Sequence, residues 1–146
     1  MNRDHTDRLL GAVGAVLDRF LVEGADGQPR PLRYNPVDYA TLKRVEDTPD
    51  IRATDIAADL RIPATTMQSA LDRLVSMGFL EKRAHATDGR AKVYRLTDEG
   101  TDLRRRIHAQ DRANMSAMLG VLDEDEREGF VRKMERIEAA LRGEQA

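Results

Sequence analysis

The sequence contains no cysteine and no tryptophan, and aromatic residues make up only 4% of its 146 positions. Without cysteine, disulfides, thiol nucleophiles, thiolate zinc sites and thiol-based redox sensing are excluded. The longest apolar run, Leu9–Val16, is interrupted by glycine and falls short of the roughly 18 to 20 residues that cross a bilayer. Acidic residues occupy the N-terminal region where a secretory signal needs a basic and then an apolar stretch. We therefore expect a cytoplasmic protein with no membrane partner.

Charge is unevenly distributed along the chain, although the formal net charge is only −2. Residues 61–106 include ten basic and six acidic side chains, a local balance of +4 that leaves −6 for the remainder. A basic segment on an acidic body fits phosphate contact on one side and repulsion elsewhere. His5, His85 and His108 lack metal-ligand spacing, so these histidines are expected to be exposed or hydrogen-bonded, with no metal and no cofactor.

Apolar periodicity and helix-breaking residues predict a mainly helical chain. Helices are expected at about residues 6–23, 36–47 and 54–60. The next helix, Ala64–Met77, combines one apolar stripe with a face of small polar groups, and Gly78 can end it in the left-handed conformation. Two longer helices follow, the first capped by Thr97. Gly100 weakens that helix, and the residue spacing gives no reason for it.

A β-hairpin is expected directly after the helix Ala64–Met77. Residues 79–84 and 92–96 are strand-like runs on either side of a turn with Asp88 and Gly89 at its tip. Two short helices joined by a tight link and followed by a hairpin are the elements of a winged helix-turn-helix. The predicted fold is therefore mainly α with a small β-hairpin wing at Lys82–Tyr94, plus terminal helices that form a dimerisation region.

The polar face of the helix Ala64–Met77 suits the major groove of DNA. Thr65, Gln68 and Ser69 lie on that face; threonine methyls can meet thymine, hydroxyls suit several bases, and glutamine can form two bonds with adenine. Any surface helix has a polar face, and that interpretation stays open for the helix alone. The hairpin that follows favours the DNA-reading interpretation.

From Asn35 to Ile107 the sequence resembles the multiple-antibiotic-resistance regulator (MarR) family. The matching segments are NPVDYATLKRV, ATDIAADLRIPATTMQSALDRLVSMGFLEKR and TDGRAKVYRLTDEG. The aspartate and arginine of the family's wing correspond to Asp88 and Arg90, and the motif that opens the next helix corresponds to Leu96, Thr97 and Gly100. The sequence departs from the family at Pro63, where a capping residue is common, and at Ser69, where an arginine is common, so no relative's base preference is transferable.

The resemblance implies roles for the residues of the helix and the wing. Arg90 would enter the minor groove, Asp88 would help to hold the wing, and Arg73 would brace the wing or touch phosphate. Lys82, Arg83 and Lys92 are expected to set general affinity for phosphate. The complete set of expected DNA contacts is Ala64, Thr65, Thr66, Gln68, Ser69, Arg73, Lys82, Arg83, Asp88, Arg90 and Lys92.

The resemblance also implies a domain organisation and partners. The expected parts are an N-terminal dimerisation helix and loop (1–34), a winged helix-turn-helix region (35–97) and C-terminal dimerisation helices (98–146). A homodimer would bind a pseudo-palindromic operator in double-stranded DNA as a repressor that a small-molecule effector releases. Phe20, Tyr34 and Tyr39 are candidate effector contacts, the alternative being that these aromatics belong to the core.

Two other classes of function were weighed. An enzyme is disfavoured because the chain has scattered histidines, no phosphate-cradling glycine loop and no clear carboxylate pair. The stronger alternative is a winged-helix protein-interaction module without specific DNA binding, whose wing and helix face would normally be acidic or apolar. The basic residues in and next to the wing favour contact with phosphate instead: Lys82, Arg83, Arg90, Lys92 and Arg95.

Overall fold

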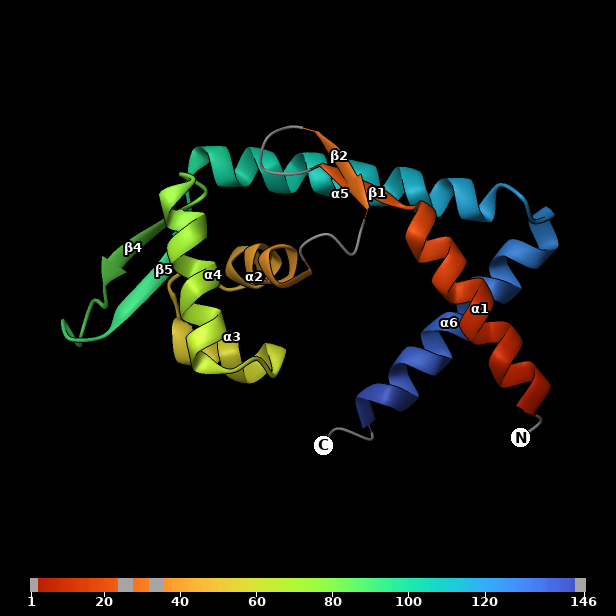
Figure 1. Cartoon of the computed structure of the whole chain (residues 1–146), viewed down its shortest axis with the longest axis horizontal. Coiled ribbons are helices and arrows are strands. Elements are labelled where there is room, and N and C mark those ends of the chain that lie inside the picture. Colours follow the sequence, from red (N-terminus) through yellow and green to blue (C-terminus); the bar gives the residue numbers. More distant parts are fainter. Residues whose placement is uncertain (1–2, 24–27, 32–35, 144–146) are drawn as a thin grey trace. The chain divides into compact units, whose positions relative to one another are not determined.

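The computed structural model describes residues 3–23, 28–31 and 36–143, and it confirms the mainly helical fold with a small antiparallel wing sheet (Figure 1). The chain forms two compact units, residues 1–110 and 111–146. Within the described residues, no helix combines the length and the apolar content that a bilayer crossing requires.

The first unit contains most of the elements. Its helices are α1 (Arg3–Arg19), α2 (Pro36–Asp47), α3 (Ala53–Leu60), α4 (Ala64–Ser76) and the first part of α5 (Asp98–Leu119). Its strands are β1 (Leu21–Glu23), β2 (Pro29–Pro31), β3 (Ile51–Arg52), β4 (Leu80–Ala84) and β5 (Lys92–Leu96). Strand β1 pairs with β2, and β5 lies between β3 and β4 in an antiparallel sheet. The predicted helix over 6–23 is therefore wrong at its end, because 21–23 form a strand.

Backbone conformation explains the tight link between α3 and α4. Arg61 ends α3 with a φ of 53°, and its N–H and that of Ile62 donate to carbonyls in the last turns of α3. The extended backbone of Pro63 then precedes the first residue of α4. At the other end of α4, Gly78 has a φ of +83°, which confirms its predicted left-handed conformation.

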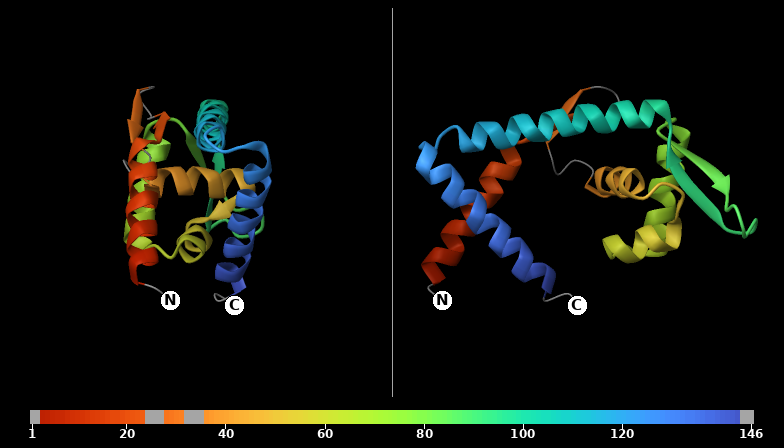
Figure 2. Two further views of the ribbon diagram at one scale, coloured as in Figure 1. Left: turned by 90° about the vertical axis from the view of Figure 1, so that its right-hand side faces the viewer. Right: turned by 180° about the vertical axis from the view of Figure 1, so that it is seen from behind.

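The core of this unit lies where α2, α3, α4 and the start of α5 pack against the sheet. The predicted stripe of α4 is confirmed, since Met67, Ala70, Leu71 and Leu74 are at most 2% exposed. Burial of each leucine or methionine side chain stabilises the fold by about 1.5 to 3 kcal/mol. The other buried members are Leu42, Val45, Ile51, Ile56, Ala57, Phe79, Leu80, Tyr94, Leu103 and Ile107. With this face of α4 turned inward, its polar face is left to solvent, and the wing projects beyond α4 on the side away from α2 (Figure 2).

The start of α5 lies against the backbone that connects α4 to β4. Thr97 caps the helix as predicted, because its Oγ1 accepts the N–H of Gly100 at 3.0 Å. The N–H of Thr97 donates to the carbonyl oxygen of Phe79 at 3.1 Å. A Cβ on Gly100 would lie 2.0 Å from that same oxygen. The glycine is therefore explained by a close approach between two backbones.

The second unit consists of the last part of α5 and helix α6 (Glu124–Gly143). At the junction, Glu126 Oε2 accepts the N–H of Asp123 at 3.0 Å, which caps α6. Helix α6 has no buried residue in this chain. Met134, Ile137 and Leu141 are 50%, 50% and 55% exposed, so this apolar stripe has no cover within the described part of the unit.

Candidate nucleic-acid interface

Helix α4 and the wing present the expected DNA-contacting residues on one region of the first unit. On α4, Ala64, Thr65, Thr66 and Ser69 are exposed, while Gln68 is half-buried. The hydroxyl of Ser69 donates to the carbonyl oxygen of Thr65 at 3.0 Å and is folded back on its own helix. A face of short side chains allows the backbone of α4 to approach base edges closely.

Gln68 is held by two neighbours rather than extended into solvent. Its Nε2 donates to Asp72 Oδ1 at 2.9 Å and to the hydroxyl of Tyr94, a buried residue of β5, at 3.3 Å. Both amide hydrogens are then used within the protein, which leaves Oε1 to accept from a base amino group. The predicted two-bond contact with adenine requires one of these internal bonds to open. Sequence reasoning missed both partners. Tyr94 is 26 residues away along the chain, whereas Asp72 follows Gln68 by four positions, a helical spacing that could have predicted this bond.

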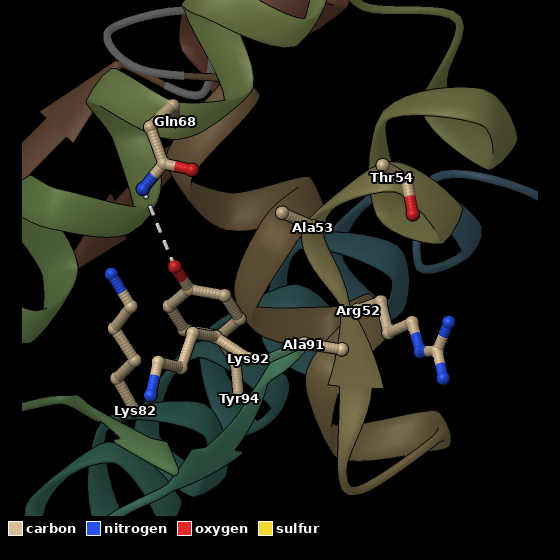
Figure 3. Close-up of a pocket in the computed structure, with 8 residues that line it drawn as sticks. All are labelled: Arg52, Ala53, Thr54, Gln68, Lys82, Ala91, Lys92 and Tyr94. Carbon is tan, nitrogen blue, oxygen red and sulfur yellow. Dashed lines mark hydrogen bonds between the residues drawn. The ribbon is translucent and has the colours of Figure 1, made fainter. Parts of the chain in front are cut away.

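An open pocket of about 310 Å³ lies between α4 and the wing, next to Gln68 and Tyr94 (Figure 3). Lys82 of β4 extends towards the Gln68–Tyr94 hydrogen bond, and Lys92 of β5 lies beside Lys82 in the lining. Its other lining residues are Arg52, Ala53, Thr54 and Ala91. No acidic residue is in the lining, so the pocket has the charge that suits an anionic group such as a backbone phosphate.

Three arginines in and around the expected interface are already paired within the protein. Arg73 binds Asp38 of α2 through two bonds, Nε to Oδ2 at 3.0 Å and Nη2 to Oδ1 at 2.5 Å. Arg83 lies 2.7 Å from a carboxylate oxygen of Glu81. The third arginine, Arg95, pairs with Asp50. Among the described residues, the ion pair of Arg73 is with α2, and its expected role of bracing the wing or touching phosphate stays a prediction.

The pairing of Arg95 joins the wing to the turn before β3. Arg95 donates through Nε and Nη2 to the two carboxylate oxygens of Asp50, at 3.1 and 2.5 Å. These hydrogen bonds lower the pKa of Asp50; slight burial opposes the shift, and the charges of Arg95, Arg83 and His85 add to it. In the same way, the hydrogen bonds that Arg95 donates to Asp50 and that Arg73 donates to Asp38 raise the pKa of both arginines. Sequence reasoning assigned Arg95 to phosphate and missed Asp50.

The remaining cations of the wing are Lys82, Lys92 and Arg90. All three are exposed, and they make no ion pair within the described part of the chain. Arg90 lies at the tip, and its N–H donates to Asp88 Oδ1 at 3.2 Å. The carbonyl of Asp88 accepts the N–H of Ala91 at 3.1 Å. The carboxylate of Asp88 therefore orders the backbone that carries Arg90, which supports the wing-holding role expected from the sequence.

The expected effector contacts do not form a described site. Tyr39 of α2 is half-buried and packs against the core of the first unit, which favours the alternative that it is a core residue. Phe20 is half-buried after α1, and Tyr34 lies outside the described residues. Among residues 3–23, 28–31 and 36–143, no three histidine or carboxylate side chains gather as metal ligands would.

Comparisons with known proteins give the same fold. Residues 34–91 match the family model of the MarR family. The PcaV transcriptional regulator from Streptomyces coelicolor is 24% identical over 98% of this chain and 99% of its own, with a TM-score of 0.67. A second PcaV structure contains its natural ligand. The YusO protein from Bacillus subtilis is 18% identical over 94% of both chains, with a TM-score of 0.75.

A mutant of MepR from S. aureus, bound to an oligodeoxyribonucleotide, is 17% identical over 97% of this chain and 99% of its own, with a TM-score of 0.61. No curated protein matches the sequence. The resemblance to the MarR family is confirmed over residues 34–91, which its family model matches, and the chain has the fold of PcaV, YusO and MarR.

Proposed function

We propose that this protein is a bacterial, cytoplasmic transcription regulator that binds double-stranded DNA sequence-specifically as a homodimer. The observation that carries the proposal is the polar face of α4 beside a wing whose Lys82, Lys92 and Arg90 make no ion pair in the described chain. Unpaired cations around a face of small polar groups supply both parts of DNA recognition, phosphate attraction and base reading. The oligodeoxyribonucleotide bound in the MepR structure supports this use of the fold.

The charge of the interface also distinguishes this function from its main alternative. A winged helix that docks on another protein would normally present an acidic or apolar wing. Here the pocket between α4 and the wing is lined by two lysines and one arginine and by no carboxylate. The expected division of the chain into dimerisation parts (1–34 and 98–146) and a DNA-binding part (35–97) follows from the same proposal.

One set of binding measurements tests both DNA binding and the separate roles of Gln68 in base reading and of Lys82 and Lys92 in phosphate contact. Fragments selected from the source genome should bind with a Kd that weakens as salt rises, because phosphate contacts release counterions. Gln68→Ala should cost about 1 to 3 kcal/mol on a selected fragment and little on random DNA. Lys82→Ala and Lys92→Ala should weaken both and lower the salt slope by about one unit each.

Lys133→Ala is the matched control for the lysine variants, since Lys133 is an exposed residue of α6 in the second unit. Its affinity and salt slope should equal those of the unmodified protein. Fluorescence anisotropy on a selected and a random duplex gives all these numbers. Equal losses on both duplexes for Gln68→Ala would show that α4 does not read bases, and no salt-sensitive binding at all would support the protein-interaction alternative.

A homodimer accounts for the apolar side chains that the single chain leaves uncovered. On α1, Leu9, Leu10 and Val13 are 64%, 73% and 47% exposed. The stripe of α6 is similarly exposed. A two-fold dimer that covers these faces would also place two copies of α4 on successive turns of a duplex.

The dimer is tested by sedimentation velocity at micromolar concentration, which should give twice the 16.4 kDa mass of the chain. Ile137→Glu should shift the mass towards the monomer, because it places a charge in the apolar stripe of α6. Ala139→Glu is the control, as Ala139 is exposed and lies half a turn of helix away from Ile137. A monomer mass for the unmodified, folded protein would contradict the proposal.

The regulator is further proposed to be a repressor that a small molecule releases from its operator. The support is the PcaV structure that contains a natural ligand. Phe20, Tyr34 and Tyr39 stay the candidate contacts, although the packing of Tyr39 against the core weakens its part. Compounds that the genes beside the selected fragments act on are the first to test for release of the bound duplex.

A further inference from the structure

The turn of the wing is organised around the ring of His85, the residue that follows β4. Its Nδ1 accepts the N–H of Asp88 at 3.2 Å and the N–H of Thr87 at 3.3 Å. The Thr87 hydroxyl lies 3.2 Å from the same nitrogen. The backbone N–H of His85 donates to the carbonyl of Ala91 at 2.9 Å, which closes the turn. Two backbone N–H groups of this exposed turn thus donate to one nitrogen of the His85 ring.

This arrangement requires one protonation state of the ring. A nitrogen that accepts two backbone N–H groups must carry a lone pair, so the neutral ring has its proton on Nε2. An imidazolium carries a proton on both nitrogens, and its Nδ1–H would point at two other donors. Protonation therefore removes the two backbone hydrogen bonds and sets Nδ1–H against their donors, and the Thr87 hydroxyl is the one neighbour of the turn that can accept from it.

We propose that His85 is a positioning residue of the wing: its neutral ring orders the turn that presents Arg90, and its protonation releases that turn. The consequence for DNA rests on the DNA-binding function proposed above. Asp88, whose N–H the ring binds, is also the residue whose carboxylate accepts the N–H of Arg90 at 3.2 Å. Two successive hydrogen bonds, both involving Asp88, therefore connect the His85 ring to the backbone of Arg90.

The charged groups around the His85 ring do not provide a second site whose protonation would release the turn. Asp88 and Arg90 belong to the same turn, Arg83 of β4 precedes His85 by two positions, and Asp50 lies on the turn before β3. Arg95 holds Asp50 in its ionised form by lowering its pKa. Of these groups, only the ring of His85 accepts backbone hydrogen bonds of the turn at a nitrogen that a proton would occupy. A pH-dependent change of the wing that His85→Asn abolishes is therefore assigned to this ring.

The proposal predicts a sign opposite to that of simple electrostatics. A proton on His85 adds a positive charge beside the duplex, which alone would strengthen binding to any sequence. Release of the turn instead weakens binding to a selected fragment as the pH falls. We expect a loss of about tenfold in Kd between about pH 8 and pH 5.5, the size expected for one to two hydrogen bonds. Random DNA should show no such loss.

The wing itself can be tested without DNA. In two-dimensional NMR spectra of the full chain, the amide signals of Thr87 and Asp88 should shift with the titration of the His85 ring. His85→Asn places an oxygen near the position of Nδ1 and does not titrate, so these amides should keep constant shifts between pH 8 and 5.5. His85→Gln places its oxygen farther out and should leave the turn disordered at every pH.

The same proteins are then titrated with a fragment selected from the source genome and with a random duplex of equal length. His85→Asn should bind the fragment with a pH-independent affinity close to that of the unmodified protein at pH 8, and His85→Gln should bind weakly throughout. His108→Asn, a change at an exposed histidine of α5, should keep the pH dependence of the unmodified protein. Thermal unfolding confirms that each variant is folded.

The outcomes separate the two proposals. The inference is overturned if the amide shifts of Thr87 and Asp88 do not change when the His85 ring is protonated. It is also overturned if the selected fragment binds equally or more tightly at low pH. If the amides follow His85 but no variant binds any duplex at any pH, the DNA-binding function fails and the pH-sensitive turn stands. Amides and fragment affinity that change together, and only in proteins that retain His85, support both.

Discussion

Gly100→Ala should destabilise the protein by about 3 kcal/mol or more, as expected where an added group meets rigid backbone in a packed interior. The new Cβ would lie 2.0 Å from the carbonyl oxygen and 3.0 Å from the carbonyl carbon of Phe79. That carbonyl cannot move aside freely, because it accepts the N–H of Thr97. In an open helix position the same change would stabilise by up to about 1 kcal/mol, so the sign itself is informative.

Gly129→Ala is the matched control for this prediction. Gly129 lies in α6 on a side that it shares with Arg132 and Arg136, away from the apolar stripe, and a Cβ there meets nothing within 4 Å. Urea unfolding of both variants at one fixed protein concentration measures the difference, since the stability of a dimer depends on concentration. A stability of Gly100→Ala equal to or above that of the unmodified protein would mean that α5 does not start against the α4–β4 connection.

Local pattern was sufficient to predict the elements of the winged-helix region. The stripe from Met67 to Leu74 repeats with the helical period, so it predicted both the extent of α4 and the face that it buries. Gly78, the Thr97 cap and the hairpin are likewise signals that lie within a few residues of their effect. The order of these elements, rather than any single residue, predicted the winged helix.

Features that depend on distant residues could not be predicted in this way. The reason for Gly100 is a carbonyl 21 positions earlier in the chain, that of Phe79. The strand β1 was taken as the end of a helix, because its partner β2 begins and ends with proline, a residue that normally argues against a strand.

Side-chain partners were the least predictable part of the candidate site. The sequence identifies Arg73 as a cation on α4, but it cannot show that Asp38, 35 residues away, binds it. The same limit applies to Arg95. For His85, the expectation of an exposed or hydrogen-bonded residue was correct in kind, and only the geometry of the turn shows that its ring is the acceptor.

Arg90→Ala should weaken binding to a selected fragment by about 1 to 3 kcal/mol and lower the salt slope by about one unit. Arg90 is exposed at the tip of the projecting wing, with no ion pair in the described chain to hold its guanidinium back. At that position it can enter a minor groove, where narrow A·T-rich segments have an enhanced negative potential. The loss should therefore be larger on fragments with A·T-rich flanks than on G·C-rich ones. Arg90 is outside the core, so unfolding should not change.

Asp88 provides the test of how Arg90 is presented. Asp88→Ala removes a negative charge near DNA and should nevertheless weaken binding, because the carboxylate accepts the N–H of Arg90 at 3.2 Å and orders the tip. Asp88→Asn keeps an oxygen acceptor at that position without the charge, so it should bind at least as tightly as the unmodified protein. Salt titrations of these variants on one fragment compare two effects on affinity, the order of the wing tip and the negative charge of Asp88. Tighter binding by Asp88→Ala would show that charge decides, and an unchanged affinity and slope for Arg90→Ala would leave the wing without a role in binding.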